Sequence, residues 1–371
     1  MGGVPVGGGS PVSVQSMLNV RTSDAAAAIR QCEELHRAGA DILRLSVDTP
    51  DDVKALREIA AASPVPLVAD IQFERGAAIP ALAAGAAAVR VNPGLFPLDG
   101  DDLKTLAAEV VKRNAAIRVG ANAGSIGEAA VRAECRKGLT RPEALARVLA
   151  EKTLRQCEAL EKLGVYHVKA ALKSSDVGVM IEANRIFAAR SEIPLHLGVT
   201  EAGTLYRGLV RSACGIGALL LSGIGDTIRV SLTENPLEEV RAGIAILEAC
   251  GLRPAQPEIV SCPTCGRTEI DLPRLVRSVE ELVTKLKSAG KQLPFKKIAV
   301  MGCPVNGPGE ARDADLGLAG SRNGEVVLFR HGETLGAFDA EAGLKKLEEL
   351  LTAAAERGNV PNFLEPICQG E

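Results

Sequence analysis

Eight successive strand–helix units restrict this 371-residue chain to very few folds. From residue 12 onward, short runs rich in β-branched residues alternate with longer amphipathic segments rich in Ala and Leu, which is typical of consecutive βα units. The expected strands are residues 11–17, 41–47, 66–72, 87–93, 116–122, 166–172, 194–200 and 226–232. Eight such units within ~240 residues predict an α/β fold whose parallel sheet closes into a (β/α)8 TIM-type barrel.

The segments between these strands carry the start signals of helices. Residues 23–39, 50–63 and 235–251 each have Asp or Asn near the start, and the first and last of them end in Gly. The chain has no Trp, and Phe and Tyr total only nine residues. Ala, Val, Leu and Ile must therefore build the core, as is usual in α/β proteins.

A break in this pattern predicts a second domain. Residues 251–259 contain two prolines and no apolar periodicity, so we expect a barrel over 1–250, a linker over 251–258 and a smaller α+β domain over 259–371. The elements expected in the smaller domain are a helix at 272–291, a strand at 297–302, a hairpin at 325–338 and a final helix at 339–358.

Composition argues against several classes of function. The formal net charge of −3 gives no basic excess for nonspecific nucleic-acid binding. No apolar run reaches the ~20 residues of a membrane span, and the first residues lack the cationic and apolar regions of a secretory signal. Nine scattered cysteines do not suggest a disulfide framework. These features favour a cytoplasmic protein.

Polar residues at the predicted strand ends point to an anionic substrate. The carboxyl ends of barrel strands form the active site in folds of this type. The residues at those positions are Asn19, Arg44, Asp70, Arg90, Asn92, Arg118, Asn122, Lys173, Glu201 and Arg229. Any one cation is more often an ordinary solvent-facing charge, but five together would repel one another unless an anion joined them. We therefore expect a phosphorylated substrate, and a diphosphate fits the charge best.

Two further residues near the mouth have competing interpretations. Glu201 follows the seventh strand and is either a proton donor or acceptor, or a salt-bridge partner of one of the arginines. His196 lies within the same strand and is more often a hydrogen-bonded core histidine than a catalyst.

Three cysteines in the smaller domain form a candidate metal centre. Cys262 and Cys265 make a C-x-x-C turn after a strand, and Cys303 follows another strand inside the Gly/Pro-rich sequence GCPVNGPGE. The candidates for a fourth ligand are Glu310, Asp313, His331 and Cys368. A carboxylate would leave one iron of a cluster exchangeable, whereas His331 would complete a structural zinc site. A thioredoxin-like redox pair is a third possibility, but it needs no Cys303.

The remaining cysteines outside these motifs fall in or near predicted helices, where we expect them to be small core residues. They are Cys32, Cys135, Cys157, Cys214 and Cys250.

Several long segments resemble one known family across nearly the whole chain. They include VQSMLNVRTSD, IRVGANAGS, LHLGVTEAG, SCPTCGRTEID and MGCPVNGPGEARDADLG, in family order. The resemblance is to the bacterial 4-hydroxy-3-methylbut-2-enyl diphosphate synthases of the methylerythritol phosphate route to isoprenoids. It implies an oxidoreductase with one 4Fe-4S cluster per chain, which reductively opens 2-C-methyl-D-erythritol 2,4-cyclodiphosphate and eliminates water.

The same resemblance implies specific roles for residues and partners. The implied cluster ligands are Cys262, Cys265, Cys303 and Glu310, and the implied catalytic acid is Glu201. The implied substrate-binding residues are Arg44, Arg90, Arg118, Asn122, Lys173 and Arg229. Two electrons would arrive singly from a flavodoxin or ferredoxin. Family members are homodimers in which the cluster domain of one subunit covers the barrel mouth of the other.

The chain departs from the family pattern at a few positions. Gln72 stands where the family usually has His, Arg75-Gly76 replaces a Tyr-Arg pair, and Leu18 replaces a Thr. Gln forms hydrogen bonds but cannot carry a proton, so an acid-base role at position 72 is absent.

Two alternatives to this activity stay open from the residues alone. One is a phosphate-binding barrel with a structural zinc domain and no redox activity. The other is a barrel lyase that uses Lys173 as a Schiff-base nucleophile.

Overall fold

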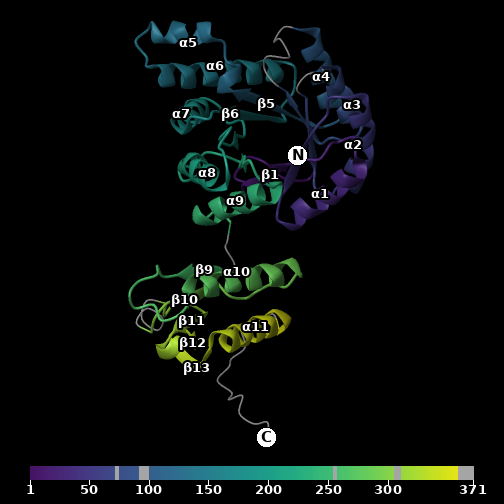
Figure 1. Cartoon of the computed structure of the whole chain (residues 1–371). Coiled ribbons are helices and arrows are strands. Elements are labelled where there is room, and N and C mark those ends of the chain that lie inside the picture. The colour runs from purple at the N-terminus through teal and green to yellow at the C-terminus, as the bar shows by residue number, and fades with distance from the viewer. Residues whose placement is uncertain (72–74, 92–99, 254–256, 305–310, 358–371) are drawn as a thin grey trace. The chain divides into compact units, whose positions relative to one another are not determined.

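The computed structural model describes residues 1–71, 75–91, 100–253, 257–304 and 311–357, and it divides the chain into two units, residues 1–253 and 254–371. The first unit is an eight-stranded parallel barrel surrounded by helices, and the second is a smaller unit with a single sheet and helices (Figure 1). The predicted fold class is confirmed. No helix in the described ranges is long and apolar enough to cross a membrane.

The eight barrel strands form one sheet whose ends meet. Its strand order is β6-β5-β4-β3-β2-β1-β8-β7, with parallel pairing throughout. A parallel bridge between Ala170 and Leu195, with Ala170 N donating to Pro194 O at 2.9 Å, joins β6 to the strand at the other edge. The strands are β1 (Ser13–Met17), β2 (Ile42–Ser46), β3 (Leu67–Asp70), β4 (Ala88–Val91), β5 (Ala116–Asn122), β6 (Val168–Lys173), β7 (His196–Leu197) and β8 (Thr227–Ile228).

All eight predicted strands are present, but the last two are shorter than expected. β7 and β8 keep regular pairing for only two residues each. Beyond them, Gly198 approaches Arg229 so closely that a Cβ on the glycine would lie 2.6 Å from the Arg229 carbonyl oxygen. The chain therefore leaves regular pairing at the point where these strands reach the barrel mouth.

Helices cover the outside of the barrel (Figure 1). They are α1 (Ala25–Arg37), α2 (Pro50–Ala62), α3 (Ala78–Ala83), α4 (Asp101–Lys112), α5 (Glu128–Cys135), α6 (Arg141–Lys162), α7 (Val177–Ala188), α8 (Leu205–Leu220) and α9 (Pro236–Ala249), with short 3-10 turns at Arg75–Ala77 and Ala123–Ser125. The three helices predicted from their start signals are confirmed as α1, α2 and α9. α2 begins with a capping box between Thr49 and Asp52, followed by Pro50 in the first turn.

The N-terminal segment closes the end of the barrel opposite the mouth. Met1 and Val6 pack against Ile42 and Val68, which point inward near the starts of β2 and β3. The rest of the barrel core is almost entirely aliphatic, as the composition predicted. Leu18, where the family usually has Thr, is part of this core.

The second unit contains a five-stranded sheet with the order β13-β12-β11-β10-β9. β9, β10 and β11 run parallel, and β12 and β13 form an antiparallel hairpin at one edge. Two helices pack on the sheet through a core of Leu, Val, Ile and Phe side chains. The elements are β9 (Glu258–Ser261), α10 (Leu272–Ser288), β10 (Lys297–Met301), β11 (Leu316–Gly320), a 3-10 turn (Arg322–Gly324), β12 (Glu325–Arg330), β13 (Glu333–Asp339) and α11 (Ala340–Arg357).

The sequence interpretation of this unit missed one strand. β11 is a short LGLAG run whose two glycines weaken the strand pattern. A Cβ on Gly317 would lie 2.2 Å from the Phe329 ring, so the close packing of β12 requires glycine at position 317. The same glycine weakens the strand pattern in the sequence. The other predicted elements are confirmed.

The cysteines outside the motifs were predicted as core residues, which is correct for only some of them. Cys32 and Cys157 are buried, and Cys135 and Cys250 are partly exposed. Cys214 is exposed on α8, so its assignment to the core was wrong. It lies on the helix face that points away from the barrel.

Replacing Phe187 by Ala should destabilise the barrel. Its ring is fully buried between α7 and the strands, and Phe→Ala changes at such sites lower the free energy of unfolding by about 3–5 kcal/mol. The matched control is Tyr206→Ala, which removes a ring that is 80% exposed and should change stability by less than about 0.5 kcal/mol. Urea denaturation followed by circular dichroism measures both. Equal losses would contradict the assigned core.

Candidate active site

Strand register brings the predicted cations together inside the barrel mouth. Asp70 on β3 is paired with Arg90 on β4, Arg90 with Arg118 on β5, and Asn122 with Lys173 on β6. Paired residues of parallel strands point to the same side of the sheet, which here is the barrel interior. Arg44, Arg90, Arg118 and Lys173 are all at least 92% buried. These residues and Arg229 are called the cation cluster below.

One carboxylate holds two members of the cation cluster. Asp70 Oδ1 lies 3.1 Å from Arg90 Nη1, and its Oδ2 lies 3.7 Å from Arg44 Nε. The Asp70 side chain is 1% exposed. Breaking such a pair would leave a buried charge without its partner, so Asp70 fixes both guanidiniums.

A second carboxylate, Glu239, holds Arg229 from the start of α9. Arg229 donates to both Glu239 oxygens at 3.3 Å, and the same carboxylate accepts from Leu232 N at 3.0 Å. Ser16 Oγ also donates to it at 3.4 Å. Sequence reasoning missed Glu239. The available signal was an acidic residue in the first turn of the helix that follows the eighth strand.

Arg118 is held by an amide oxygen rather than by a carboxylate. Arg118 Nη1 donates to Gln15 Oε1 at 3.3 Å, while Arg118 Nε and Gln15 Nε2 have no hydrogen-bond partner within the described residues. Gln15 was not among the predicted site residues, although a polar side chain at an inward position of a strand was visible in the sequence. The mouth thus contains hydrogen-bonding groups that no described residue satisfies.

The pKa values of the cation cluster show the cost of this crowding. Burial, followed by the charge of Arg229, lowers the pKa of Arg44 to about 10. Burial also lowers the pKa of Arg118 well below its usual range, with Arg44 and Arg90 adding to the effect. The pKa of Lys173 falls in the same way, first through burial and then through Arg118. A bound anion would relieve both the burial penalty and the mutual repulsion.

Two glycines give these side chains room. A Cβ on Gly120 would lie 2.8 Å from Arg90 Nε, and a Cβ on Gly198 would lie 2.8 Å from Lys173 Nζ. Any larger residue would displace a member of the cation cluster. Both glycines were missed as site residues, because a glycine in a strand gives no sign of which neighbouring side chain it accommodates.

Glu201 occupies a strained backbone position beside the mouth. Its φ of 54° lies in the left-handed region, which costs a non-glycine residue roughly 1–3 kcal/mol. The side chain is exposed and makes no ion pair within the described part of the chain, so the salt-bridge alternative is not supported. Strain of this kind is common at active sites.

The other polar residues near the strand ends have varied positions. His196 is fully buried, its Nδ1 lies 2.7 Å from Thr227 Oγ1, and burial lowers its pKa well below its usual value, so it is the core histidine that was expected. Asn19 is exposed and hydrogen-bonds Gln31 of α1. Asn92 and Gln72 lie outside the described residues.

In the second unit, two of the predicted thiol ligands lie at neighbouring strand ends. Cys262 follows β9 and Cys303 follows β10, and the two strands pair in parallel up to Ser261 and Val300. Gly302 N donates to Cys262 Sγ at 3.2 Å, which holds that sulfur next to the residue before Cys303. Cys303 is 3% exposed.

Cys265 lies in the turn that follows Cys262. Its backbone N donates to Thr268 Oγ1 at 3.1 Å, and hydrogen bonds from the backbone and side chain of Arg267 lower the pKa of its thiol. This turn packs closely against Gly302, which follows β10. A Cβ on Gly302 would lie only 2.9 Å from Thr268 Oγ1. Among the described residues, no three Cys, His, Asp or Glu side chains are gathered closely enough to hold a metal ion.

The topology removes two of the candidate fourth ligands. His331 lies in the turn between β12 and β13, and Asp313 pairs with Lys297 at the start of β10. β12 runs antiparallel to β11, so both positions are at the end of the sheet opposite the cysteines. The zinc site completed by His331 is therefore not formed. Glu310 and Cys368 lie outside the described residues.

Replacing Asp70 by Asn should destabilise the barrel by about 3–5 kcal/mol, because it leaves Arg44 and Arg90 buried without a countercharge. The matched control is Asp101→Asn, which breaks an exposed pair with Lys104 and should change stability far less. Urea denaturation at low ionic strength measures both changes. Similar, small effects would show that Asp70 does not hold the cation cluster.

Comparisons with known proteins agree with this two-unit structure. The family model described as the GcpE TIM-barrel domain matches residues 1–244, and that of the GcpE protein C-terminal domain matches residues 258–353. Three relatives are named 4-hydroxy-3-methylbut-2-en-1-yl diphosphate synthase (flavodoxin).

These relatives are similar to the chain over nearly its full length. The protein from Persephonella marina is 46% identical over 90% of both chains. The protein from Salinispora arenicola is 44% identical over all of this chain and 92% of its own, and that from Aquifex aeolicus is 42% identical over 95% and 93%. The chain therefore belongs to the GcpE family.

Proposed function

We propose that this chain is a 4-hydroxy-3-methylbut-2-enyl diphosphate synthase that uses 2-C-methyl-D-erythritol 2,4-cyclodiphosphate as its substrate. The observation that carries the proposal is the cation cluster, in which five basic side chains lie with the carboxylates of Asp70 and Glu239 in the barrel mouth. A cyclic diphosphate places negative charge on both phosphates and so matches this excess. The printed name of the relatives supports the same substrate class.

The substrate-holding residues are Arg44, Arg90, Arg118, Asn122, Lys173 and Arg229. Asp70 and Glu239 hold three of the arginines in place before the substrate arrives, so little reorganisation is needed on binding. The arginines also stabilise the diphosphate as the leaving group when the ring opens. This role requires Lys173 to be charged, and pairing with a phosphate would raise its lowered pKa, which favours ion pairing over a Schiff-base role.

The second unit binds a 4Fe-4S cluster through Cys262, Cys265, Cys303 and Glu310. Iron–sulfur clusters are held by thiolates, and three thiols follow two neighbouring parallel strands here, with backbone N–H groups nearby to hydrogen-bond sulfur. When bound, such a cluster supplies electrons one at a time. The carboxylate of Glu310 would be the weakest of the four ligands.

Glu201 is the proton donor of the reaction. Written for fully protonated species, the substrate gains two electrons and two protons, one C–O bond of the ring breaks, and one hydroxyl leaves as water. An exposed carboxylate held in a strained conformation beside the cation cluster suits the protonation of that hydroxyl.

The remaining proposals concern partners and location. Flavodoxin is the proposed electron donor, as the printed names of the relatives suggest. We further propose a cytoplasmic homodimer in which the cluster unit of one subunit covers the barrel mouth of the other. A dimer of this kind would give the substrate and the electron source a shared site.

Replacing Cys303 by Ala should abolish cluster binding. The variant loses one of three thiolate ligands, so iron should fall from about four per chain to well below one. The matched control is Cys214→Ala, which removes an exposed thiol of the barrel and should keep the full iron content. Anaerobic iron, sulfide and zinc analysis of the purified proteins makes the comparison. Stoichiometric zinc without iron in the unaltered protein would refute the cluster proposal.

Replacing Glu201 by Gln should lower kcat by about 10²–10⁴-fold while leaving the absorbance of the cluster unchanged, because Gln cannot donate the proton. The matched control is Glu192→Gln, an exposed residue just before β7 at the other end of the barrel, which should not alter turnover. Steady-state rates with the cyclodiphosphate and a reduced viologen provide the measurement. Full activity in Glu201→Gln would remove Glu201 from the mechanism.

A further inference from the structure

A cavity lies at the end of the barrel opposite the mouth. It has a volume of about 350 Å³ and is lined by residues from the N-terminal segment, from the starts of β5 and β6, and from the approach to β7. These include Val6, Ala116, His167, Lys169 and Pro194. The strand starts and the strand ends are at opposite ends of a parallel barrel, so this cavity is separate from the cation cluster.

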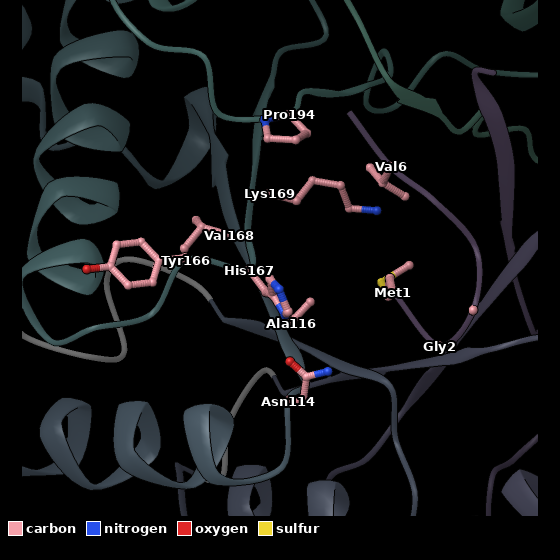
Figure 2. A pocket seen from close by; sticks show the side chains of 11 residues that line it. Met1, Gly2, Val6, Asn114, Ala116, Tyr166, His167, Val168, Lys169 and Pro194 are labelled. Atoms are coloured by element: carbon pink, nitrogen blue, oxygen red, sulfur yellow. The ribbon is translucent and has the colours of Figure 1, made fainter. Parts of the chain in front are cut away.

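Lys169 extends into this cavity. Figure 2 shows its side chain reaching from β6 toward Val6, with Met1 nearby and the amine at the tip. The residue is 95% buried, and its Nζ has no hydrogen-bond partner within the described residues. A buried ammonium that lacks any acceptor is costly, so the position requires a compensating group that the described protein does not supply.

The surroundings of Lys169 add positive charge. Arg118 on β5 is paired with Lys169 in the sheet. Burial, followed by the charge of Arg118, lowers the pKa of Lys169 to about 7. Asp226 offsets this only in part, and its Oδ2 already accepts a hydrogen bond from Leu195 N at 2.7 Å. The charge that would balance Lys169 is therefore missing from the described side chains around it.

We propose that this cavity binds a small carboxylate with an apolar body. The carboxylate pairs with Lys169 Nζ, and the hydrocarbon part contacts Val6, Ala116 and Pro194. The Lys169 ammonium can pair with one carboxylate, and the lining beside it is mixed, with Val6, Ala116 and Pro194 next to Asn114, His167 and the Met1 amine. This site does not depend on the proposed catalytic activity.

The two anion sites lie along the same strand. Lys169 and Lys173 are four residues apart on β6, which corresponds to ~13 Å at the usual rise of a strand. Arg118 is adjacent to Lys169 in the sheet and belongs to the cation cluster. A carboxylate beside Lys169 would therefore also reduce the repulsion on Arg118.

The test uses hexanoate as the ligand and hexanamide as its uncharged analogue, at constant ionic strength. Thermal unfolding of the full chain is measured for the unaltered protein, Lys169→Met and Lys162→Met. Lys162→Met removes an exposed lysine from α6 and is the matched control. At a hexanoate concentration about ten times its Kd, binding should raise the Tm of the unaltered protein by about 3–6 °C.

The proposal predicts a saturable rise with hexanoate in the unaltered protein and in Lys162→Met, no rise in Lys169→Met, and no rise with hexanamide in any of them. An equal rise with hexanoate and hexanamide, or no saturable rise at all, would refute it without any variant. A full hexanoate response in Lys169→Met would also refute it. If Lys169→Met does not fold, Lys169→Gln replaces it with the same expected loss.

Discussion

Closure of the parallel sheet into a ring is the constraint on which the candidate active site depends. The bridge between Ala170 and Leu195 joins the two edges of the sheet, and the strand ends then face a common centre. Arg44, Arg118 and Arg229 come from positions far apart in the sequence, yet their charges affect one another directly. In an open sheet these side chains would be spread along one edge, and no single anion could contact them all.

The same closure makes the two ends of the barrel chemically different. At the mouth, Asp70 and Glu239 neutralise part of the positive charge and leave the rest for a substrate. At the other end, the N-terminal segment fills the interior with apolar side chains, and Lys169 extends into the cavity there, where its charge and that of the Met1 amine affect each other. An aliphatic core between the strands and the surrounding helices stabilises the fold enough to keep these cations buried.

The sequence predicted the barrel well because periodicity is a local property. β5 was predicted at its observed bounds, and the strand ends with basic residues did meet at one mouth. Gln15 was missed because its contact with Arg118 joins residues 103 apart in the sequence, and Gly120 because its role depends on the Arg90 side chain of the neighbouring strand. Glu239 was missed although its place in the first turn of α9 was visible in the sequence. His331 stayed a plausible ligand until the antiparallel hairpin placed it at the wrong end of the sheet. Cys214 was misassigned because a helix presents both buried and exposed faces.

The most direct test of the central claim is turnover by the unaltered protein. Anaerobically purified protein is mixed with the cyclodiphosphate and reduced flavodoxin, and the products are followed by mass spectrometry. We predict that 4-hydroxy-3-methylbut-2-enyl diphosphate accumulates, with one molecule formed for every two electrons consumed, and only while reduced flavodoxin is present. Unchanged cyclodiphosphate in a sample that contains its full iron and an active reductant would contradict the proposed function.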